Sequence, residues 1–182
     1  MHLVFAHGKE SGPWGFKIKR LAAIARASAC TVESIDYRDT MDPDERVERL
    51  LTRLADAPPE LVLVGSSMGG YVSLVASAKV AVAGVFLMAP ALYIPSWKQQ
   101  QYPSRAAHIE IVHGWADDII PVQHSIDFAR DAECDLHLIP GDHPLNTSIA
   151  RVEAIFSGFL ERVRSSLQTS NSPGKAGESA PR

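Results

Sequence analysis

The sequence predicts one three-layer, doubly wound α/β domain with a mostly parallel sheet of six strands. A chain of 182 residues has the length of a single domain and can bury one sizeable core. Short apolar runs alternate along it with stretches in which apolar residues recur every three or four positions. Such alternation is typical of βαβ units, whose helices cover both faces of a parallel sheet.

The predicted strands are apolar runs rich in Val, Ile and Leu that are too short for typical helices and are bounded by Gly, Pro or Asp. They cover residues 2–7, 31–36, 61–65, 82–88, 109–113 and 136–139. Between the predicted strands, apolar residues recur with helical spacing in residues 16–24, 47–54, 68–79 and 122–129. Asp42, Pro43 and Glu45 have the residue types of a helix cap, a first-turn proline and a favourable first-turn charge.

The last predicted helix opens at His143 and Pro144 and runs to about Val163. Beyond it, residues 165–182 are rich in Ser, Gly and Pro and poor in apolar residues, which predicts a disordered tail after a domain of residues 1–164. Prolines and a Gln run interrupt any period in residues 91–107, so we expect only a short excursion over the top of the sheet there.

Composition excludes several functional classes. The chain is 46% hydrophobic and 21% charged, with a net charge of −3, as in ordinary globular proteins. Its basic residues are dispersed, and we interpret the densest cluster, Lys17, Lys19 and Arg20, as the solvated face of a helix rather than a nucleic-acid site. No basic leader and no apolar run of membrane-spanning length is present, which predicts a cytoplasmic protein without a membrane span.

The most informative motif is Gly65-Ser66-Ser67-Met68-Gly69, which follows an apolar strand and precedes a helix-compatible segment. Gly-x-Ser-x-Gly in that context predicts a nucleophile elbow, in which a strained serine lies on a sharp turn that leaves no room for side chains two residues away. Ser66 would require glycine at Val64, so Ser67 is the candidate nucleophile. The alternative is a glycine-rich turn with a helix-capping serine.

A serine nucleophile needs a histidine base, which in such folds follows the acid along the chain. Of seven histidines, His143 stands on a loop directly after the last predicted strand, at the carboxyl edge of the sheet. His137 falls within a strand and His124 within a helix, while His108 and His113 precede the candidate acid. His143 is therefore the candidate base, and the alternative is an ordinary residue at a helix N-terminus.

The candidate acid lies in the segment after the predicted strand 109–113, where Asp117 and Asp118 also emerge at the carboxyl edge. Spacing favours Asp117, with Asp118 solvated or capping the next helix. Asp142 is a weak third candidate because it is adjacent to His143. A metal site built from His113, Asp117 and Asp118 lacks a paired histidine motif, so we predict no metal and no cofactor.

An oxyanion hole needs two backbone N–H donors. Met68, directly after the nucleophile, and Lys9, in the glycine-bearing loop after the first strand, are the candidates. Four aromatic residues fall in loops at the catalytic edge and are candidate walls of the substrate pocket, although aromatic residues in short loops also seal cores. They are Trp14, Tyr93, Trp97 and Trp115.

Four segments, FAHGKESGPWG, VGSSMGGY, HGWADDIIP and GDHPL, resemble in this order the α/β-hydrolase superfamily, especially its compact lidless esterases and thioesterases. The resemblance covers about residues 2–163 and implies the strand order 2-1-3-4-5-6. That order places Cys30 and Cys134 at opposite edges of the sheet, so both are expected to be free. Two departures are Ser66, where many relatives have His, and residues 89–107, which leave no room for a lid domain.

Together these features predict a serine hydrolase of the carboxylesterase or thioesterase type, which cleaves a small-molecule substrate through an acyl-enzyme on Ser67. His143 would be the base and Asp117 its orienting acid. Amidase or peptidase activity on the same fold is one alternative. A hydrolase-like binding module without turnover is the other. Neither the natural substrate nor the oligomeric state is indicated.

Overall fold

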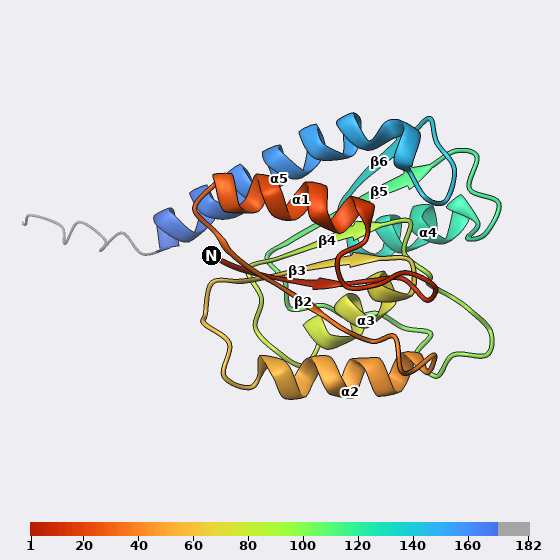
Figure 1. Ribbon diagram of the computed structural model, residues 1–182, viewed down its shortest axis with the longest axis horizontal. Helices are drawn as coiled ribbons and strands as arrows, with labels where there is room; N and C mark the ends of the chain where they lie inside the picture. The colour runs from red at the N-terminus through yellow and green to blue at the C-terminus, as the bar shows by residue number, and fades with distance from the viewer. Residues whose placement is uncertain (171–182) are drawn as a thin grey trace, which may run out of the picture.

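Six parallel strands form the middle layer of the computed structural model, which describes residues 1–170 (Figure 1). They are β1 (His2–Ala6), β2 (Thr31–Ile35), β3 (Leu61–Ser66), β4 (Gly84–Met88), β5 (His108–Gly114) and β6 (Asp135–Ile139). They pair in the order β2-β1-β3-β4-β5-β6, and every pair is parallel. The predicted fold class and strand order are confirmed.

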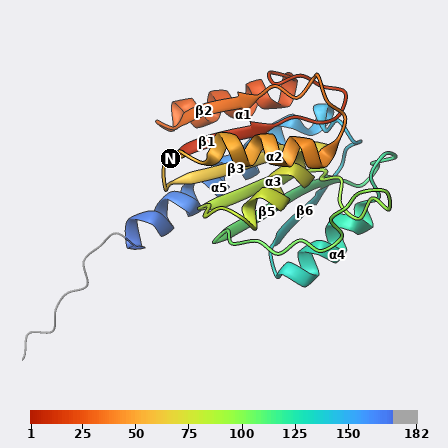
Figure 2. The ribbon, with the colours of Figure 1, turned by 90° about the horizontal axis from the view of Figure 1, so that it is seen from below.

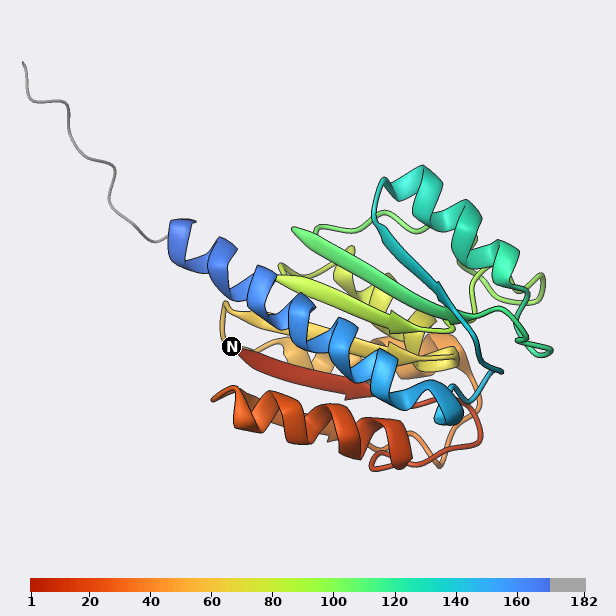
Figure 3. The same cartoon turned by 90° about the horizontal axis from the view of Figure 1, so that it is seen from above.

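Helices cover both faces of this sheet. They are α1 (Phe16–Ala27), α2 (Pro43–Leu54), α3 (Met68–Ser77), α4 (Val122–Ala132) and α5 (Ile149–Ser170). Helices α1 and α5 lie across one face (Figure 3), and α2, α3 and α4 lie across the other (Figure 2). The carboxyl ends of all six strands therefore meet along one edge, where the loops that carry the candidate site emerge.

Each face of the sheet has its own apolar core. Along β1, Leu3 and Phe5 pack into the core under α1 and α5, whereas Val4 and Ala6 pack into the core under α2 and α3. Because helices cover both faces, the inner strands β1, β3 and β4 are nearly continuous apolar runs, whereas the edge strands β2 and β6 carry polar residues. Asp42 caps α2 as predicted, since its side chain accepts hydrogen bonds from the N–H groups of Asp44 (2.8 Å) and Glu45 (3.3 Å).

Helix α5 differs from its prediction at both ends. The expectation that His143 and Pro144 open it was wrong: the Asp142 side chain accepts a hydrogen bond from the N–H of Leu145 (3.1 Å). Leu145 has a left-handed φ of 57°, and the chain makes a 3-10 turn at Asn146–Ser148 before α5 begins. The loop thus holds His143 above the strand ends.

At its other end α5 continues to Ser170, beyond the predicted boundary at residue 164. Leu167 is partly buried against the core under α1 and α5, which extends the apolar face of the helix by one further turn. Residues 165–170 are therefore helical rather than disordered as predicted. The rest of the predicted tail, residues 171–182, lies outside the described residues.

Residues 91–107 connect β4 to β5 without forming a helix or a strand. A buried tyrosine, Tyr102, holds this segment, since its hydroxyl accepts a hydrogen bond from the N–H of Tyr93 and donates one to the carbonyl of Gln99, both at 2.9 Å. Cys30 and Cys134 precede the two edge strands and are free, as expected. Among the helices of residues 1–170, none has the length and apolar character that a membrane crossing requires.

Candidate active site

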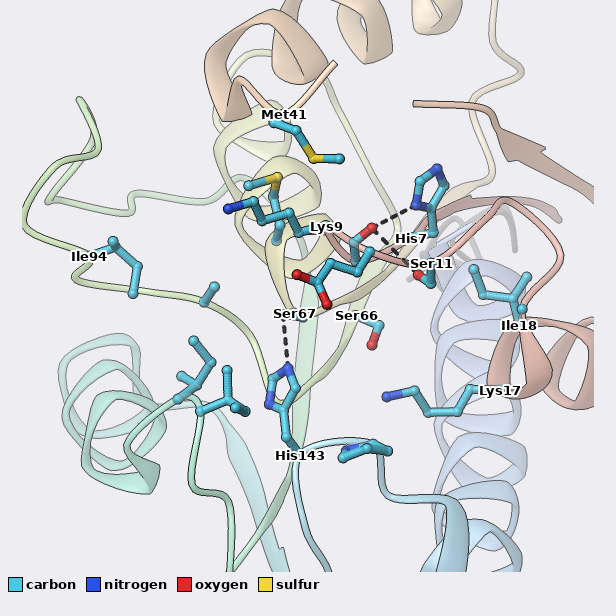
Figure 4. A pocket seen from close by; sticks show the side chains of 18 of the residues that line it. His7, Lys9, Ser11, Lys17, Ile18, Met41, Ser66, Ser67, Ile94 and His143 are labelled. Atoms are coloured by element: carbon cyan, nitrogen blue, oxygen red, sulfur yellow. Dashed lines mark hydrogen bonds between the residues drawn. The ribbon is translucent and has the colours of Figure 1, made fainter. Parts of the chain in front are cut away.

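Ser67 occupies the turn between β3 and α3 in a strained conformation, with φ 54° and ψ −121°. Both flanking glycines are required by close backbone approach. A Cβ atom on Gly65 would lie 2.3 Å from the carbonyl oxygen of Gly69, and one on Gly69 would lie 2.0 Å from that of Ala6. The N–H of Ser67 donates to the carbonyl of Met88 at 3.0 Å, which ties the turn to β4. Ser67 thereby faces the cavity at the strand ends (Figure 4).

His143 extends from the loop after β6 toward Ser67 (Figure 4). Its Nε2 lies 3.0 Å from Ser67 Oγ, and its Nδ1 lies 2.7 Å from Asp117 Oδ2. Because an ionised carboxylate only accepts hydrogen bonds, Nδ1 carries the proton and Nε2 is left to accept one from the serine hydroxyl. The three residues that the sequence singled out thus form one chain of hydrogen bonds.

Asp117 is held as a carboxylate by several donors. Its Oδ1 accepts from the N–H groups of Ile119 (2.9 Å) and Ile120 (2.8 Å), while its Oδ2 accepts from His143. Burial alone would raise the pKa of this fully buried carboxyl, but the two N–H groups and the histidine outweigh burial and keep that pKa below its usual value. Asp117 is therefore ionised at neutral pH and fixes the tautomer of His143.

The other candidate acids lie elsewhere. Asp118 is exposed, and within residues 1–170 it makes no hydrogen bond to a histidine. Asp142 is exposed as well and caps the turn at Leu145. The same residues 1–170 hold no group of three or more His, Cys, Asp or Glu side chains placed to bind a metal ion.

A second histidine, His113, contacts the same carboxylate and was missed by the sequence analysis. Its Nε2 lies 3.0 Å from Asp117 Oδ2 and 3.1 Å from the carbonyl of Ile120, both acceptors, so this nitrogen carries the proton. Its Nδ1 accepts from Ser125 Oγ at 2.7 Å. Burial lowers the pKa of His113 despite the nearby carboxylate, so the ring stays neutral. Its place four residues before Asp117 was the one available signal.

The loop after β1 carries the N–H of Lys9, the first candidate oxyanion donor. The carbonyl of Gly8 accepts hydrogen bonds from His7 Nδ1 (2.7 Å) and from Arg46 Nη1 (3.3 Å). Since C=O and N–H of a trans peptide point in opposite directions, the Lys9 N–H faces away from Arg46. Gly8 lies against the nucleophile, because a Cβ atom built on it would be 3.4 Å from the Cβ of Ser67.

The N–H of Met68, at the first position of α3, is the other candidate donor. Among the described residues, no protein acceptor engages the N–H of either Lys9 or Met68. Two unpaired N–H groups beside one serine hydroxyl form an arrangement that can accept an oxyanion.

Arg46 supports this loop from beneath. It lies on α2 with its side chain fully buried, and its guanidinium donates to the carbonyls of Thr40 (2.7 Å), Tyr37 (3.1 Å) and His7 (3.3 Å) as well as Gly8. Burial lowers the pKa of this guanidinium, which nonetheless remains charged at any physiological pH. In the sequence Arg46 resembles any solvated helix arginine, so no pattern indicated its role.

A cavity of about 740 Å³ opens beside Ser67 and His143. Of the four aromatic residues predicted as its walls, only Trp97 lines it. The prediction was wrong for Trp14, which packs under the Arg26 guanidinium, and for Trp115, which is 60% exposed. It was also wrong for Tyr93, whose ring packs against Tyr102 and His124.

The apolar walls that sequence analysis missed come from the start of α1 and from scattered loops, and no local pattern marked them as cavity residues. They are Phe16, Ile18, Met41, Ile94, Ile119, Ile120 and Pro144. The basic cluster was also misread in part. Lys19 is exposed and Arg20 pairs with Glu153 (2.8 Å), but Lys17 lines the cavity.

Comparison with known proteins supports the same fold. A family model described as "Alpha/beta hydrolase family" matches residues 3–173. The chain is similar to a putative hydrolase of the alpha/beta superfamily from Xanthomonas campestris pv. campestris, with 32% identity, a TM-score of 0.77, and coverage of 88% of this chain and 98% of that one. No curated protein matches the sequence.

Two further solved structures share the fold at lower identity. One is a Xanthomonas campestris protein described as a member of the a/b serine hydrolases without lid, with 20% identity, a TM-score of 0.67, and coverage of 88% and 81%. The other is the Pyrococcus furiosus esterase Pf2001, with 14% identity, a TM-score of 0.75, and coverage of 88% and 82%. Of the two coverage values given for each structure, the first refers to this chain and the second to the other protein.

Proposed function

The chain belongs to the alpha/beta hydrolase family, and we propose that it is a serine hydrolase that cleaves small carboxylic esters or thioesters. The observation that carries this proposal is the unbroken chain of hydrogen bonds from Ser67 Oγ through His143, at 3.0 and 2.7 Å, to the buried carboxylate of Asp117. The distance of 3.0 Å lies in the range that proton transfer from a nucleophile to its base requires, and the distance of 2.7 Å is that of a hydrogen bond that orients the base.

In this proposal Ser67 Oγ attacks the carbonyl carbon while His143 Nε2 takes the hydroxyl proton. The imidazolium that forms is stabilised by the carboxylate of Asp117, which keeps its own negative charge. Negative charge develops on the carbonyl oxygen, and the N–H groups of Lys9 and Met68 donate to it. These donors are fixed before the reaction, so their alignment costs no reorganisation during it.

Collapse of the tetrahedral intermediate expels the alcohol or thiol, which takes the proton from His143 Nε2. Water then attacks the acyl-enzyme with His143 again as base, and the acid product leaves with Ser67 restored. All of these steps use residues of this chain alone.

Two features support a small substrate. The cavity beside Ser67 has about 740 Å³, within the range of small-molecule sites. Residues 91–107, the segment where a lid domain would be inserted, lie over the strand ends instead and contribute Ala91, Ile94, Ser96 and Trp97 to the wall.

Initial rates on 4-nitrophenyl butyrate and on the matching thioester test the proposal. Ser67→Ala should lower kcat by about a thousandfold or more, as deletion of a triad nucleophile does in other serine hydrolases. Ser66→Ala, the adjacent control, should keep the wild-type turnover. Equal rates for Ser67→Ala and the wild type would overturn the proposal, as would the absence of hydrolysis of every ester, thioester and amide offered, which would indicate a binding module.

A further inference from the structure

Lys17 stands in the first turn of α1 and points into the cavity, on the same side as His143 (Figure 4). Its side chain is half-buried, in contrast to the exposed Lys19 on the same helix. Among residues 1–170, no hydrogen-bond acceptor or carboxylate contacts its ammonium group. A cation that is partly removed from water without a partner is costly, and such groups are commonly found at binding sites.

The surroundings of Lys17 leave its charge available. Burial lowers the pKa of Lys17 to about 8, although the carboxylates of Asp117 and Asp142 oppose that shift. The ammonium is therefore mostly protonated at pH 7. Asp117 already accepts four hydrogen bonds. Among the described residues, neither Asp117 nor Asp142 lies within hydrogen-bond or salt-bridge distance of the lysine, so both act on it only through longer-range electrostatics.

The cavity combines a basic side chain with apolar walls. Lys17 and Ile94 lie on opposite sides of Ser67 in Figure 4. Met41, Ile94 and Trp97 are among the apolar residues that line it. Lys9 and Glu10 also line the cavity, but both are exposed and of opposite charge, so they largely offset each other. Of the lysine and glutamate side chains that line the cavity, Lys17 is the partly buried one.

We infer that Lys17 is a specificity-determining residue that binds a carboxylate of the substrate, so that the preferred substrates are esters or thioesters carrying an anionic group near the scissile bond. This inference rests on the proposed hydrolase function and narrows its substrate class. The anionic group supplies the partner that the lysine lacks, while the rest of the substrate contacts the apolar walls. The carboxylate can be borne by the acyl group or by the alcohol.

Two matched ester pairs distinguish a carboxylate on the acyl group from one on the alcohol. Mono-4-nitrophenyl glutarate is compared with 4-nitrophenyl 5-methylhexanoate, in which an isopropyl group replaces the carboxylate. For an alcohol-borne anion, 4-acetoxybenzoate is compared with its methyl ester. The uncatalysed rate, measured with Ser67→Ala, is subtracted. The variants are Lys17→Met, which keeps the length of the side chain, and Lys19→Met, which removes the same charge from the exposed part of α1.

Lys17→Met should lower kcat/KM for the anionic ester of at least one pair by about ten- to a hundredfold, the worth of one charge-assisted hydrogen bond, and leave its neutral partner near the wild-type value. Lys19→Met should change neither. Equal losses on both esters of each pair would mean that Lys17 only maintains the site, and no loss on any ester would mean that it does not contact substrate. Either outcome overturns the inference.

Above pH 8 the lysine loses its proton, so the ratio of anionic to neutral kcat/KM should fall there in the wild type and stay flat in Lys17→Met. Asp117, Asp142 and His143 face Lys17 as well, and taking the ratio cancels their effect on chemistry common to both esters. If the wild type hydrolyses neither ester, the proposed function fails, and binding of the anionic ester to Ser67→Ala tests Lys17 separately. Dissociation constants that do not rise when Lys17→Met is added would overturn the inference there too.

Discussion

The guanidinium of Arg46 donates a hydrogen bond of 3.3 Å to the carbonyl oxygen of Gly8, on the peptide whose N–H belongs to Lys9. A buried arginine on α2 thus sets the direction of a candidate oxyanion donor in a different loop. Because the same guanidinium also binds the carbonyls of Thr40 and Tyr37, it links two loops at the strand ends.

Replacing this arginine should affect stability and catalysis together. Arg46→Met should lower the free energy of unfolding by about 3 kcal/mol or more, since it leaves several buried carbonyls unpaired. In the folded fraction it should reduce kcat more than KM, because the lost alignment matters most when charge develops on the substrate. Urea unfolding and ester kinetics at low temperature measure the two effects. A folded variant with wild-type kcat would contradict this role.

Asp117 and Asp118 form a matched pair, because adjacent aspartates differ in burial and partners. Asp117→Asn should reduce kcat/KM for 4-nitrophenyl esters by about a thousandfold or more, since an amide does not stabilise the imidazolium and favours the wrong tautomer of His143. Asp118→Asn should remain close to the wild type. Steady-state kinetics of the two variants decide, and a larger loss in Asp118→Asn would reassign the acid.

Two buried histidines should make the fold sensitive to acid. Burial lowers the pKa values of His7 and His113, so the unfolded chain binds protons that the folded chain does not. The free energy of unfolding should therefore be highest above pH 6.5, about the pKa of histidine in the unfolded chain. It should fall as the pH drops below that value, by at most about 1.4 kcal/mol per pH unit for each histidine. Urea unfolding between pH 8 and 5 measures the slope. His113→Gln should reduce that slope, and an unchanged slope would exclude His113 as its source.

The last described turn of α5 should contribute to stability through Leu167, which packs against the core under α1 and α5. Leu167→Ala should cost about 1 kcal/mol, less than full burial of a leucine, and lower the Tm by a few degrees. Thr169→Ala, an exposed position two residues on, should leave the Tm near that of the wild type. Equal Tm values for all three proteins would show that this turn does not dock.

The sequence predicted the sheet because its strands are short segments rich in Val, Ile and Leu, and the inner strands β1, β3 and β4 are buried on both faces. It also singled out Ser67, Asp117 and His143, since the elbow glycines and the loops after β5 and β6 tie these residues to one edge of the sheet. What it missed depends on contacts between distant segments. Arg46 and Lys17 have the helical positions of solvated residues, and only the folded structure shows that Arg46 is buried against the loop after β1 and that Lys17 lines the cavity.

The pocket walls were missed for the same reason. An aromatic residue in a loop at the right edge can point into the cavity, as Trp97 does, or lie under an arginine, as Trp14 does. Local sequence does not distinguish the two. The C-terminal boundary was placed too early because the single apolar residue Leu167, among polar neighbours, is a weak helical signal until the groove it packs against is known.

Covalent labelling shows which residue of this protein is the nucleophile. The protein is treated with a fluorophosphonate, digested, and the modified residue is located by mass spectrometry. We expect one modified site, Ser67. Labelling should be abolished in Ser67→Ala and retained in Ser66→Ala, and it should be slower in Asp117→Asn because His143 is no longer oriented. Modification of a different residue in the wild type, or undiminished labelling of Ser67→Ala, would contradict the assignment of Ser67 as the nucleophile.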